Sequence, residues 1–209
     1  MSNQEMVEKL RQRGYITSKK IEEAMLSVDR AIFIKNSFPY EDTPYPVGMG
    51  QTISAPSVVA FMLEHLDVER GMKVLEIGTG SGYNTVLLSY LVGSGGHVIS
   101  IEKISELHGI AKKNLAKYNF SQNIELYIGD GSCGYEEQAP YDRIIVTAAM
   151  PNLDKIHPFV IQLKEDGKIV APVGSRLYQD LIVYEKKTNT SRKILPVMFV
   201  PLIGKYGFQ

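Results

Sequence analysis

The stretch Lys73-Val-Leu-Glu-Ile-Gly-Thr-Gly-Ser-Gly-Tyr83 decides the fold of this chain. It begins with a short apolar run, passes through glycines at positions 78, 80 and 82, and leads into a helical pattern that reaches about Leu91. Glycine lacks a Cβ atom and tolerates a positive φ, so a strand–glycine turn–helix unit lets backbone N–H groups approach a ligand closely. We therefore predict a buried strand followed by a ligand-binding loop.

Two acidic residues narrow the class of ligand. Glu76 lies near the end of this strand, and Glu102 ends the next predicted strand. An adenosyl cofactor needs such a carboxylate to bind its ribose hydroxyls. A dinucleotide fingerprint would place a third glycine where Tyr83 stands, and the phosphate-binding motif Gly-x-x-x-x-Gly-Lys-Ser/Thr is absent. The pattern favours S-adenosylmethionine over NAD, and over a tight turn that binds no ligand.

The composition of the chain limits its partners. Its 209 residues suit one domain, and the 23 basic residues balance the 23 acidic ones, so the basic excess typical of nucleic-acid binding is missing. The single Cys133 excludes an internal disulfide and suits a reducing compartment. The most apolar run, residues 194–204, is too short to cross a bilayer, and the N-terminus lacks a signal-peptide pattern. We expect a cytoplasmic protein with no nucleic-acid partner, no membrane partner and no metal; the oligomeric state stays open.

Strand and helix patterns alternate through the middle of the chain. We predict strands at residues 73–77, 97–102, 124–128, 143–147 and 168–172. Helices are predicted between them at residues 84–91, 105–118 and 153–163, and ahead of them at 5–13, 19–28 and 57–66. This alternation indicates an α/β fold with a doubly wound, mostly parallel sheet. Two more strands, at residues 181–186 and 194–200, predict a C-terminal antiparallel hairpin.

We interpret residues 1–209 as a single domain with three parts. Residues 1–70 hold the N-terminal helices and a long loop, residues 71–175 the cofactor-binding core, and residues 176–209 the hairpin and tail. In the loop, residues 37–56, prolines and glycines exclude a long regular element. Its aromatic and apolar content predicts an ordered segment, and so long a loop in a compact domain is usually functional.

Ligands of parallel sheets bind at the carboxyl ends of the strands, which gives a set of candidate residues. The cofactor-binding candidates are Glu76, Gly78, Thr79, Gly80, Ser81, Gly82, Glu102, Lys103, Gly129, Asp130, Gly131 and Thr147. Asp130, between two glycines, fits an acceptor for the exocyclic amine of adenine and fits an Asx-type turn equally well.

At three places the sequence resembles one family, the protein-L-isoaspartate (D-aspartate) O-methyltransferases. The first place is Tyr45-Pro-Val-Gly-Met-Gly-Gln-Thr-Ile-Ser-Ala-Pro56, which matches the signature loop of the family. The second is Val74-Leu-Glu-Ile-Gly-Thr-Gly-Ser-Gly-Tyr83, a cofactor loop that many methyltransferases share. The third is the series Gly129-Asp-Gly131, Pro140-Tyr-Asp-Arg-Ile-Ile-Val-Thr-Ala-Ala149 and Pro172-Val-Gly174. The similarity extends over nearly the whole chain.

The resemblance implies a Rossmann-like class I methyltransferase fold and a repair reaction. The methyl group of S-adenosylmethionine would go to the α-carboxylate of L-isoaspartyl, and also D-aspartyl, residues in damaged proteins and peptides. An α-carboxyl group is already ionised at neutral pH, so the reaction needs no general base. In agreement, none of the four histidines lies in these motifs.

The resemblance also assigns roles in the signature loop. It implies that Ser54 orients the reacting carboxylate, whereas the residues alone favour Ser54 as a helix N-cap ahead of Pro56. Both roles are compatible. The implied substrate-binding residues are Gln51, Thr52, Ile53, Ala55 and Val173.

The chain departs from the family pattern at two points. Leu163-Lys-Glu-Asp-Gly-Lys168 replaces the Pro-Gly-Gly of many relatives, which we expect to affect only a turn. Ser57-Val-Val59 stands where some relatives carry a histidine, so no role of that histidine is transferred. The last residues, 204–209, resemble a segment that helps to close the site.

Three other functions remain as alternatives. An RNA or small-molecule methyltransferase is disfavoured by the neutral charge and by Thr147-Ala-Ala149, where amino-methylating enzymes often carry Asn/Asp-Pro-Pro-Tyr/Phe. A non-catalytic adenosyl-binding adaptor would not need the signature loop. An NAD oxidoreductase is disfavoured by Tyr83.

Overall fold

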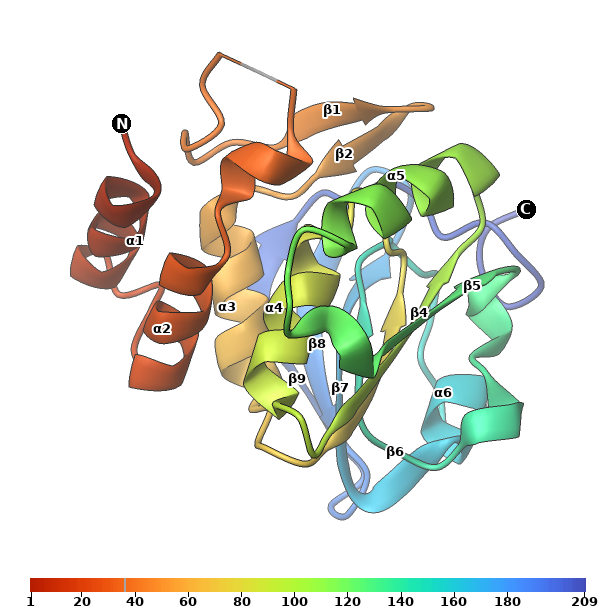
Figure 1. Cartoon of the computed structure of the whole chain (residues 1–209). Coiled ribbons are helices and arrows are strands. Elements are labelled where there is room, and N and C mark those ends of the chain that lie inside the picture. The colour runs from red at the N-terminus through yellow and green to blue at the C-terminus, as the bar shows by residue number, and fades with distance from the viewer. Residues whose placement is uncertain (36) are drawn as a thin grey trace.

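The computed structural model describes residues 1–35 and 37–209, and its N-terminal part is helical (Figure 1). The elements before the main sheet are α1 (Asn3–Gln12), α2 (Lys19–Ser27), the 3-10 turn η1 (Arg30–Phe33), the strands β1 (Tyr45–Gly48) and β2 (Gln51–Ile53), and α3 (Pro56–Leu66). The side chain of Ser18 accepts a hydrogen bond from the Ile21 N–H and caps α2, as its position in the sequence suggests. The three N-terminal helices are confirmed to within about two residues.

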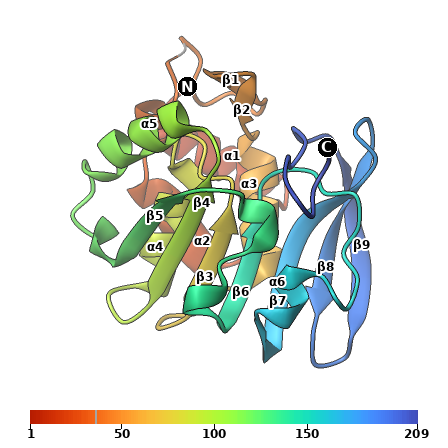
Figure 2. The same ribbon diagram turned by 90° about the vertical axis from the view of Figure 1, so that its right-hand side faces the viewer.

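A seven-stranded sheet forms the centre of the molecule. Its strands are β3 (Lys73–Ile77), β4 (His97–Glu102), β5 (Ile124–Ile128), β6 (Tyr141–Val146), β7 (Leu163–Gly174), β8 (Gln179–Glu185) and β9 (Thr190–Val197). The spatial order is β5-β4-β3-β6-β7-β8-β9 (Figure 2). The first five strands are parallel, and β8 and β9 extend the sheet as an antiparallel hairpin. The predicted fold class is confirmed.

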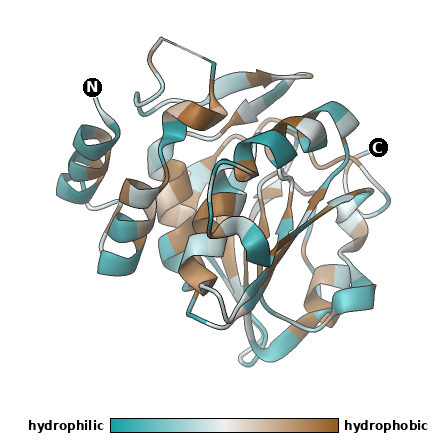
Figure 3. Ribbon diagram, viewed as in Figure 1, coloured by the Kyte–Doolittle hydropathy of each residue, from teal (hydrophilic) through white to brown (hydrophobic). Residues whose placement is uncertain are grey.

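Each face of the sheet carries its own hydrophobic core. Alternate side chains of β3 point to opposite faces: Val74 packs with α3, α4 (Tyr83–Val92) and the N-terminal helices, whereas Leu75 packs with the α6 side (Pro158–Ile161). Apolar residues gather along the inner faces of the helices, and polar residues face outward (Figure 3). Burial on both faces accounts for the continuous apolar runs of the parallel strands.

The predicted helix at residues 153–163 is largely wrong. The helix α6 covers only Pro158–Ile161, because Pro158 starts it and His157 Nδ1 caps it by accepting from the Phe159 N–H at 3.2 Å. Leu163 already belongs to β7 and pairs with Tyr141 of β6. The segment 163–168 is therefore an irregular strand start, where a turn was expected.

Smaller differences concern element ends and the loop. The helix α5 (Ser105–Leu115) stops before residue 118, β6 starts before residue 143, and β9 ends before residues 198–200. Short 3-10 turns, η2 (Ser121–Asn123), η3 (Gly131–Cys133) and η4 (Glu136–Gln138), were not foreseen. The loop at residues 37–56 contains a short hairpin in which Tyr45 pairs with Ile53. In the described part of the chain, no helix has the length and apolarity to cross a membrane.

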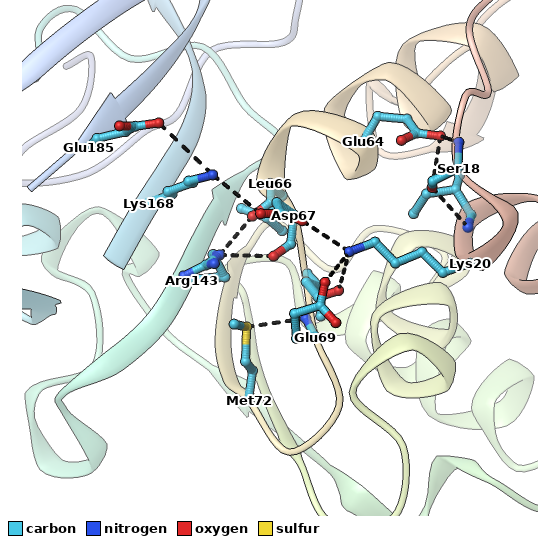
Figure 4. Close-up of polar contacts among 12 residues, drawn as sticks. Ser18, Lys20, Glu64, Leu66, Asp67, Glu69, Met72, Arg143, Lys168 and Glu185 are labelled. Atoms are coloured by element: carbon cyan, nitrogen blue, oxygen red, sulfur yellow. Dashed lines mark hydrogen bonds and ion pairs between the residues drawn. The ribbon is translucent and has the colours of Figure 1, made fainter. Parts of the chain in front are cut away.

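A polar cluster fixes the C-terminal end of α3 to both the sheet and α2 (Figure 4). Arg143 Nε on β6 donates to the carbonyls of Leu66 (2.8 Å) and Asp67 (3.2 Å), which the helix itself leaves unpaired. Lys20 on α2 and Lys168 on β7 both pair with the Asp67 carboxylate. These contacts fix the C-terminal end of α3 against β6, β7 and α2.

Candidate active site

A cavity of about 340 Å³ lies at the carboxyl ends of β3, β4 and β6. Within the sheet, β4 and β5 lie on one side of β3. The chain then crosses back, so that β6 pairs with β3 on its other side. This reversal is the topological switch point at which α/β sheets bind ligands. The β1–β2 hairpin lies over the same end of the sheet (Figure 1). The cavity is lined by Gln51, Thr52, Ile53, Ser54, Val59, Met62, Ile77, Gly78, Thr79, Gly80, Ser81, Tyr83, Asn84, Ile101, Glu102, Lys103, Ile104, Leu107, Gly131, Thr147, Ala148, Val200, Pro201, Leu202 and Ile203.

The glycine loop, residues 78–82, forms one wall of the cavity through residues 78–81. Gly78 and Gly80 both have positive φ angles, 95° and 56°. A Cβ atom on Gly78 would lie 2.4 Å from Thr147 Oγ1, so the close approach of β3 to β6 requires glycine there. A Cβ atom on Gly80 would meet no atom within 4 Å, which leaves open space above this part of the backbone. A ligand can therefore approach the loop at Gly80.

Glu102 places a carboxylate in the cavity wall. Its carboxylate accepts hydrogen bonds from the backbone N–H groups of Gly80 (2.8 Å) and Ile104 (2.9 Å). These two bonds fix the side chain and leave acceptor capacity for hydroxyl groups. The side chain is 6% exposed. The geometry fits a carboxylate that binds the ribose of an adenosyl group.

Glu76 occupies a different environment, beneath the loop and outside the cavity wall. Its carboxyl group is fully buried and accepts hydrogen bonds from Asn84 Nδ2 (2.8 Å), Thr85 Oγ1 (2.5 Å) and Ser100 Oγ (2.6 Å). Burial raises its pKa to about 7, although these three hydrogen bonds act in the opposite direction. Glu76 therefore supports the loop from below, and the sequence did not distinguish it from Glu102.

Asp130 makes a turn and contacts the C-terminal tail. Its Oδ1 accepts from the N–H (3.0 Å) and Oγ (2.7 Å) of Ser132, and its Oδ2 accepts from the Lys205 N–H (2.8 Å). Burial opposes ionisation, but these hydrogen bonds prevail and lower the pKa of Asp130. The Asx-type turn that the sequence suggests is present, and contact of Asp130 with the exocyclic amine of adenine stays a prediction. Gly131 lines the cavity and Asp130 does not.

The signature loop forms a second wall of the same cavity. Gln51, Thr52 and Ile53 belong to β2, and Ser54 follows directly. Ser54 is not the cap of α3: the cap position is Ala55, and the Ser57 N–H bonds to Asp42 Oδ1 at 2.9 Å. The N-cap hypothesis for Ser54 is therefore wrong. The described residues offer its hydroxyl no hydrogen bond.

The remaining candidates lie outside the cavity wall. Ala55 lines an adjoining cavity of about 270 Å³, together with Ser54, Thr147 and residues 195–200. Val173 forms a β-bridge with Met150 and does not line the cavity. Gly82 caps α4, and the Gly129 N–H bonds to the Glu102 carbonyl at 3.0 Å. None of these four candidates lines the main cavity.

Sequence reasoning missed several lining residues. Ile104 and Leu107 follow Glu102 along the chain, so the start of α5 was a signal that could have identified them. Residues 200–203 come from the C-terminal tail, whose Ile203 carbonyl accepts from Lys103 Nζ at 3.0 Å. Tyr83 was considered only as a missing glycine, yet its buried ring lines the cavity.

Comparison with known proteins gives the same family over the whole chain. The family model described as "Protein-L-isoaspartate(D-aspartate) O-methyltransferase (PCMT)" matches residues 1–207. Protein-L-isoaspartate O-methyltransferases of Hyperthermus butylicus and Methanothrix thermoacetophila are each 45% identical, over 98% and 100% of this chain and 89% and 98% of their own lengths.

Solved structures agree. A crystal structure described as a protein-L-isoaspartate O-methyltransferase from Plasmodium falciparum, in complex with S-adenosyl-L-homocysteine, has a TM-score of 0.88 and 28% identity. The match covers 97% of this chain and 99% of that one. A second protein-L-isoaspartate O-methyltransferase has a TM-score of 0.86 and 31% identity, over 98% of this chain and 67% of its own. This chain belongs to the protein-L-isoaspartate (D-aspartate) O-methyltransferase family.

Proposed function

We infer that this chain transfers the methyl group of S-adenosylmethionine to the α-carboxylate of L-isoaspartyl residues in damaged proteins and peptides, and to D-aspartyl residues. One observation supports this most strongly: a single cavity joins the glycine loop and Glu102 to residues 51–54 of the signature loop. A site that binds only the cofactor would need only the wall formed by the glycine loop and Glu102. The second wall gives the bound methyl donor an acceptor site.

The glycine-loop wall fits the cofactor. Glu102 would accept hydrogen bonds from the ribose hydroxyls, and the open backbone at Gly80 would lie against the ligand. The apolar side chains of Ile104 and Leu107 suit the flat face of an adenine ring. When bound, S-adenosylmethionine supplies an activated methyl group on its sulfonium. The other proposed cofactor residues are Thr79, Ser81, Lys103, Gly131 and Thr147, which share this cavity.

The signature-loop wall would orient the substrate. We propose that the Ser54 hydroxyl donates a hydrogen bond to the reacting carboxylate, since neither α3 nor any other described group uses it. Ile53, Val59 and Met62 supply apolar surface beside it and limit the access of water. Holding two reactants in line lowers the activation free energy by up to roughly 7–11 kcal/mol. Positioning is thus the main task of these residues.

The chain needs no general base for this reaction. The α-carboxyl pKa of about 3.3–3.7 leaves the nucleophile ionised at neutral pH. Three histidines have structural partners: His65 with the Phe61 carbonyl, His97 with Glu125, and His157 with the Phe159 N–H. Within the described residues, no histidine lines the cavity.

A methyl-transfer assay tests the activity. Purified protein is incubated with radiolabelled S-adenosylmethionine and three acceptors: an isoaspartyl peptide, the same peptide with normal aspartate, and RNA. We expect a base-labile methyl ester on the isoaspartyl peptide alone. Base-stable methylation of RNA would favour a nucleic-acid methyltransferase, and cofactor binding without transfer to any acceptor would favour an adaptor. A D-aspartyl version of the peptide tests the second substrate.

We also propose that the enzyme works in the cytoplasm on soluble damaged chains. The single cysteine, Cys133, suits a reducing compartment. Fractionation of cells that express the tagged protein, followed by the same assay on each fraction, would locate the activity.

A further inference from the structure

Arg30 is a charged residue with no access to solvent. It is the first residue of η1, and its side chain is 0% exposed. A buried guanidinium loses its hydration, which is costly unless hydrogen bonds replace the lost water contacts. Its contacts therefore indicate what the charge is needed for.

The guanidinium bridges two segments of the long loop. Arg30 Nε donates to the Pro39 carbonyl at 3.0 Å, and Nη2 donates to the Ser54 carbonyl at 2.8 Å. Nη1 has no hydrogen-bond partner within residues 1–35 and 37–209, so the two bonds only partly offset the cost of burial. The residue is thus held at Ser54 despite an incomplete set of partners.

The same guanidinium also contacts the glycine-loop side of the cavity. Its Cζ lies 5.3 Å from the centroid of the Tyr83 ring, within the range of a cation–π interaction. Phe33, from the same 3-10 turn, packs its ring 5.4 Å from that of Tyr83. Since Tyr83 begins α4 and lines the cavity, Arg30 connects the two cavity walls.

We propose that Arg30 is a positioning residue for methyl transfer, which fixes the backbone of Ser54 and thereby aims its hydroxyl at the substrate carboxylate. This inference rests on the role proposed above for Ser54. The side chain of Ser54 does not cap α3, so its orientation depends on its backbone, and Arg30 holds that backbone by the carbonyl. The planar fork of arginine reaches two carbonyls while its face lies on an aromatic ring, a combination that the point charge of lysine does not reproduce.

The chain provides a matched control in Arg143. It is another buried arginine, 7% exposed, and it also donates to backbone carbonyls: those of Leu66 and Asp67 through Nε, and that of Asp142 through Nη1. The carbonyls of Leu66 and Asp67 lie at the C-terminal end of α3 (Figure 4), whereas residue 54 precedes the N-terminal end of that helix. If Arg30 only stabilised the fold, its replacement should affect the rate and the melting temperature in the same way as replacement of Arg143.

The experiment compares Arg30→Lys and Arg143→Lys in the full-length protein. Three quantities are measured: the single-turnover rate with an isoaspartyl peptide, the affinity for S-adenosylhomocysteine by calorimetry, and the melting temperature. We expect Arg30→Lys to slow the single-turnover rate by roughly 10- to 100-fold while cofactor affinity stays within about twofold. Arg143→Lys should lower the melting temperature and leave the rate within about twofold. Equal rates for the two variants would overturn the proposal.

A double-mutant cycle identifies the residue through which Arg30 acts. In the Ser54→Ala background, Arg30→Lys should slow the reaction by less than about twofold more, because the hydroxyl that it positions is gone. If the double variant instead loses the product of the two single-variant factors, Arg30 does not act through Ser54. A fully active Ser54→Ala enzyme would overturn both roles, whereas an inactive wild type would instead refute the proposed reaction.

A second variant covers the case in which Arg30→Lys does not fold. Arg30→Gln keeps one donor for the Ser54 carbonyl and removes the buried charge. We expect Arg30→Gln to fold and to slow the single-turnover rate while its affinity for S-adenosylhomocysteine stays within about twofold of wild type; an unchanged rate would overturn the proposal. If neither variant binds S-adenosylhomocysteine as a folded protein at low temperature, Arg30 is a stability residue and the proposal is wrong.

Discussion

Asp42 caps α3 in place of the serine that precedes the helix: its Oδ1 accepts a hydrogen bond from the Ser57 N–H at 2.9 Å. The capping group comes from the long loop, well before the helix in sequence, so the loop and the helix start form one unit. This contact bears on the two roles considered for Ser54: the helix cap that the residues alone favour, and the carboxylate orientation that the family resemblance implies. The cap belongs to Asp42, and the hydroxyl of Ser54 is available to a substrate.

Replacing Asp42 should therefore affect stability. Asp42→Ala removes the cap and should lower the free energy of unfolding by about 0.5–2 kcal/mol. Asp42→Asn retains a capping oxygen and is the matched control, with most of the stability preserved. Urea unfolding of both variants measures the difference. Equal stability of the alanine and wild-type proteins would mean that the Ser57 N–H finds another partner.

Replacing Ser54 should affect turnover. Ser54→Ala should lower the turnover number by roughly 10- to 100-fold, the scale of one hydrogen bond to a charged group, with little change in cofactor affinity. Its melting temperature should stay near that of the wild type, because the residue is not the cap. Ser54→Asp should be slower still, since it would repel the substrate carboxylate. Single-turnover rates and melting curves, measured together, test both statements; a fully active aspartate variant would end the assignment.

Replacing Glu102 should affect cofactor binding. Loss of its hydrogen bonds to ribose hydroxyls should weaken S-adenosylmethionine binding by roughly 10- to 150-fold, or about 1.5–3 kcal/mol. Glu106→Ala is a suitable control, because Glu106 is an exposed carboxylate in the first turn of α5. Calorimetry on both variants makes the comparison. Equal affinity of Glu102→Ala and wild type, with intact folding, would remove Glu102 from the site.

The buried carboxyl of Glu76 should make stability depend on pH. Burial raises its pKa from 4.5 to about 7. Between these two values the folded state holds a proton that the unfolded state has released, so stability falls as pH rises from about 4.5 to 7 and then levels off. Glu76→Gln has no such proton. Urea unfolding at pH 5 to 8 should show wild type losing of order 1–3 kcal/mol relative to the glutamine variant; parallel curves would contradict the raised pKa.

The rate of methyl transfer should vary little with pH. The nucleophile is a substrate carboxylate and no enzymic base is proposed, so turnover should stay nearly constant from about pH 5.5 to 8. Glu76 has a pKa of about 7, within this range, but it lies outside the cavity wall, so its titration should not change the rate. A rate profile with a limb near 6.5 that disappears on mutation of one histidine would contradict the base-free mechanism.

The parts that the sequence predicted well depend on local patterns. The run from Lys73 to Tyr83 carries its own strand, turn and helix start, and alternating patterns place β3 to β6 within a few residues. The helix predicted at residues 153–163 failed because tertiary pairing of Leu163 with Tyr141 outweighed a local helical pattern. Contacts between distant segments, such as Asp42 with Ser57 or Arg30 with Ser54, leave no periodic signal in a single sequence.

The same limit applies to the individual roles in the site. Glu76 and Glu102 look alike as acids near strand ends, yet alternation along β3 sends one side chain beneath the loop, and the last residue of β4 sends the other into the cavity. Asp130 is similar: its neighbours predict a turn or a ligand contact, and the hydrogen bond from the Lys205 N–H joins it to a distant segment that no local pattern reveals. Resemblance to the family supplied the importance of residues 51–54, which physical patterns alone would not have revealed.

The C-terminal tail is anchored mainly by its backbone, and this affects which mutations it can tolerate. The N–H groups of Lys205 and Tyr206 bind Asp130 and Ser132, and the Leu202 N–H binds the Ala149 carbonyl at 2.7 Å. Side chains at such positions can vary without breaking the anchor. Gly204 is an exception, because a Cβ atom there would lie 1.9 Å from Asp130 Oδ1. In a library of randomised tails, selection for activity should therefore leave most exposed positions diverse and reduce this one almost entirely to glycine.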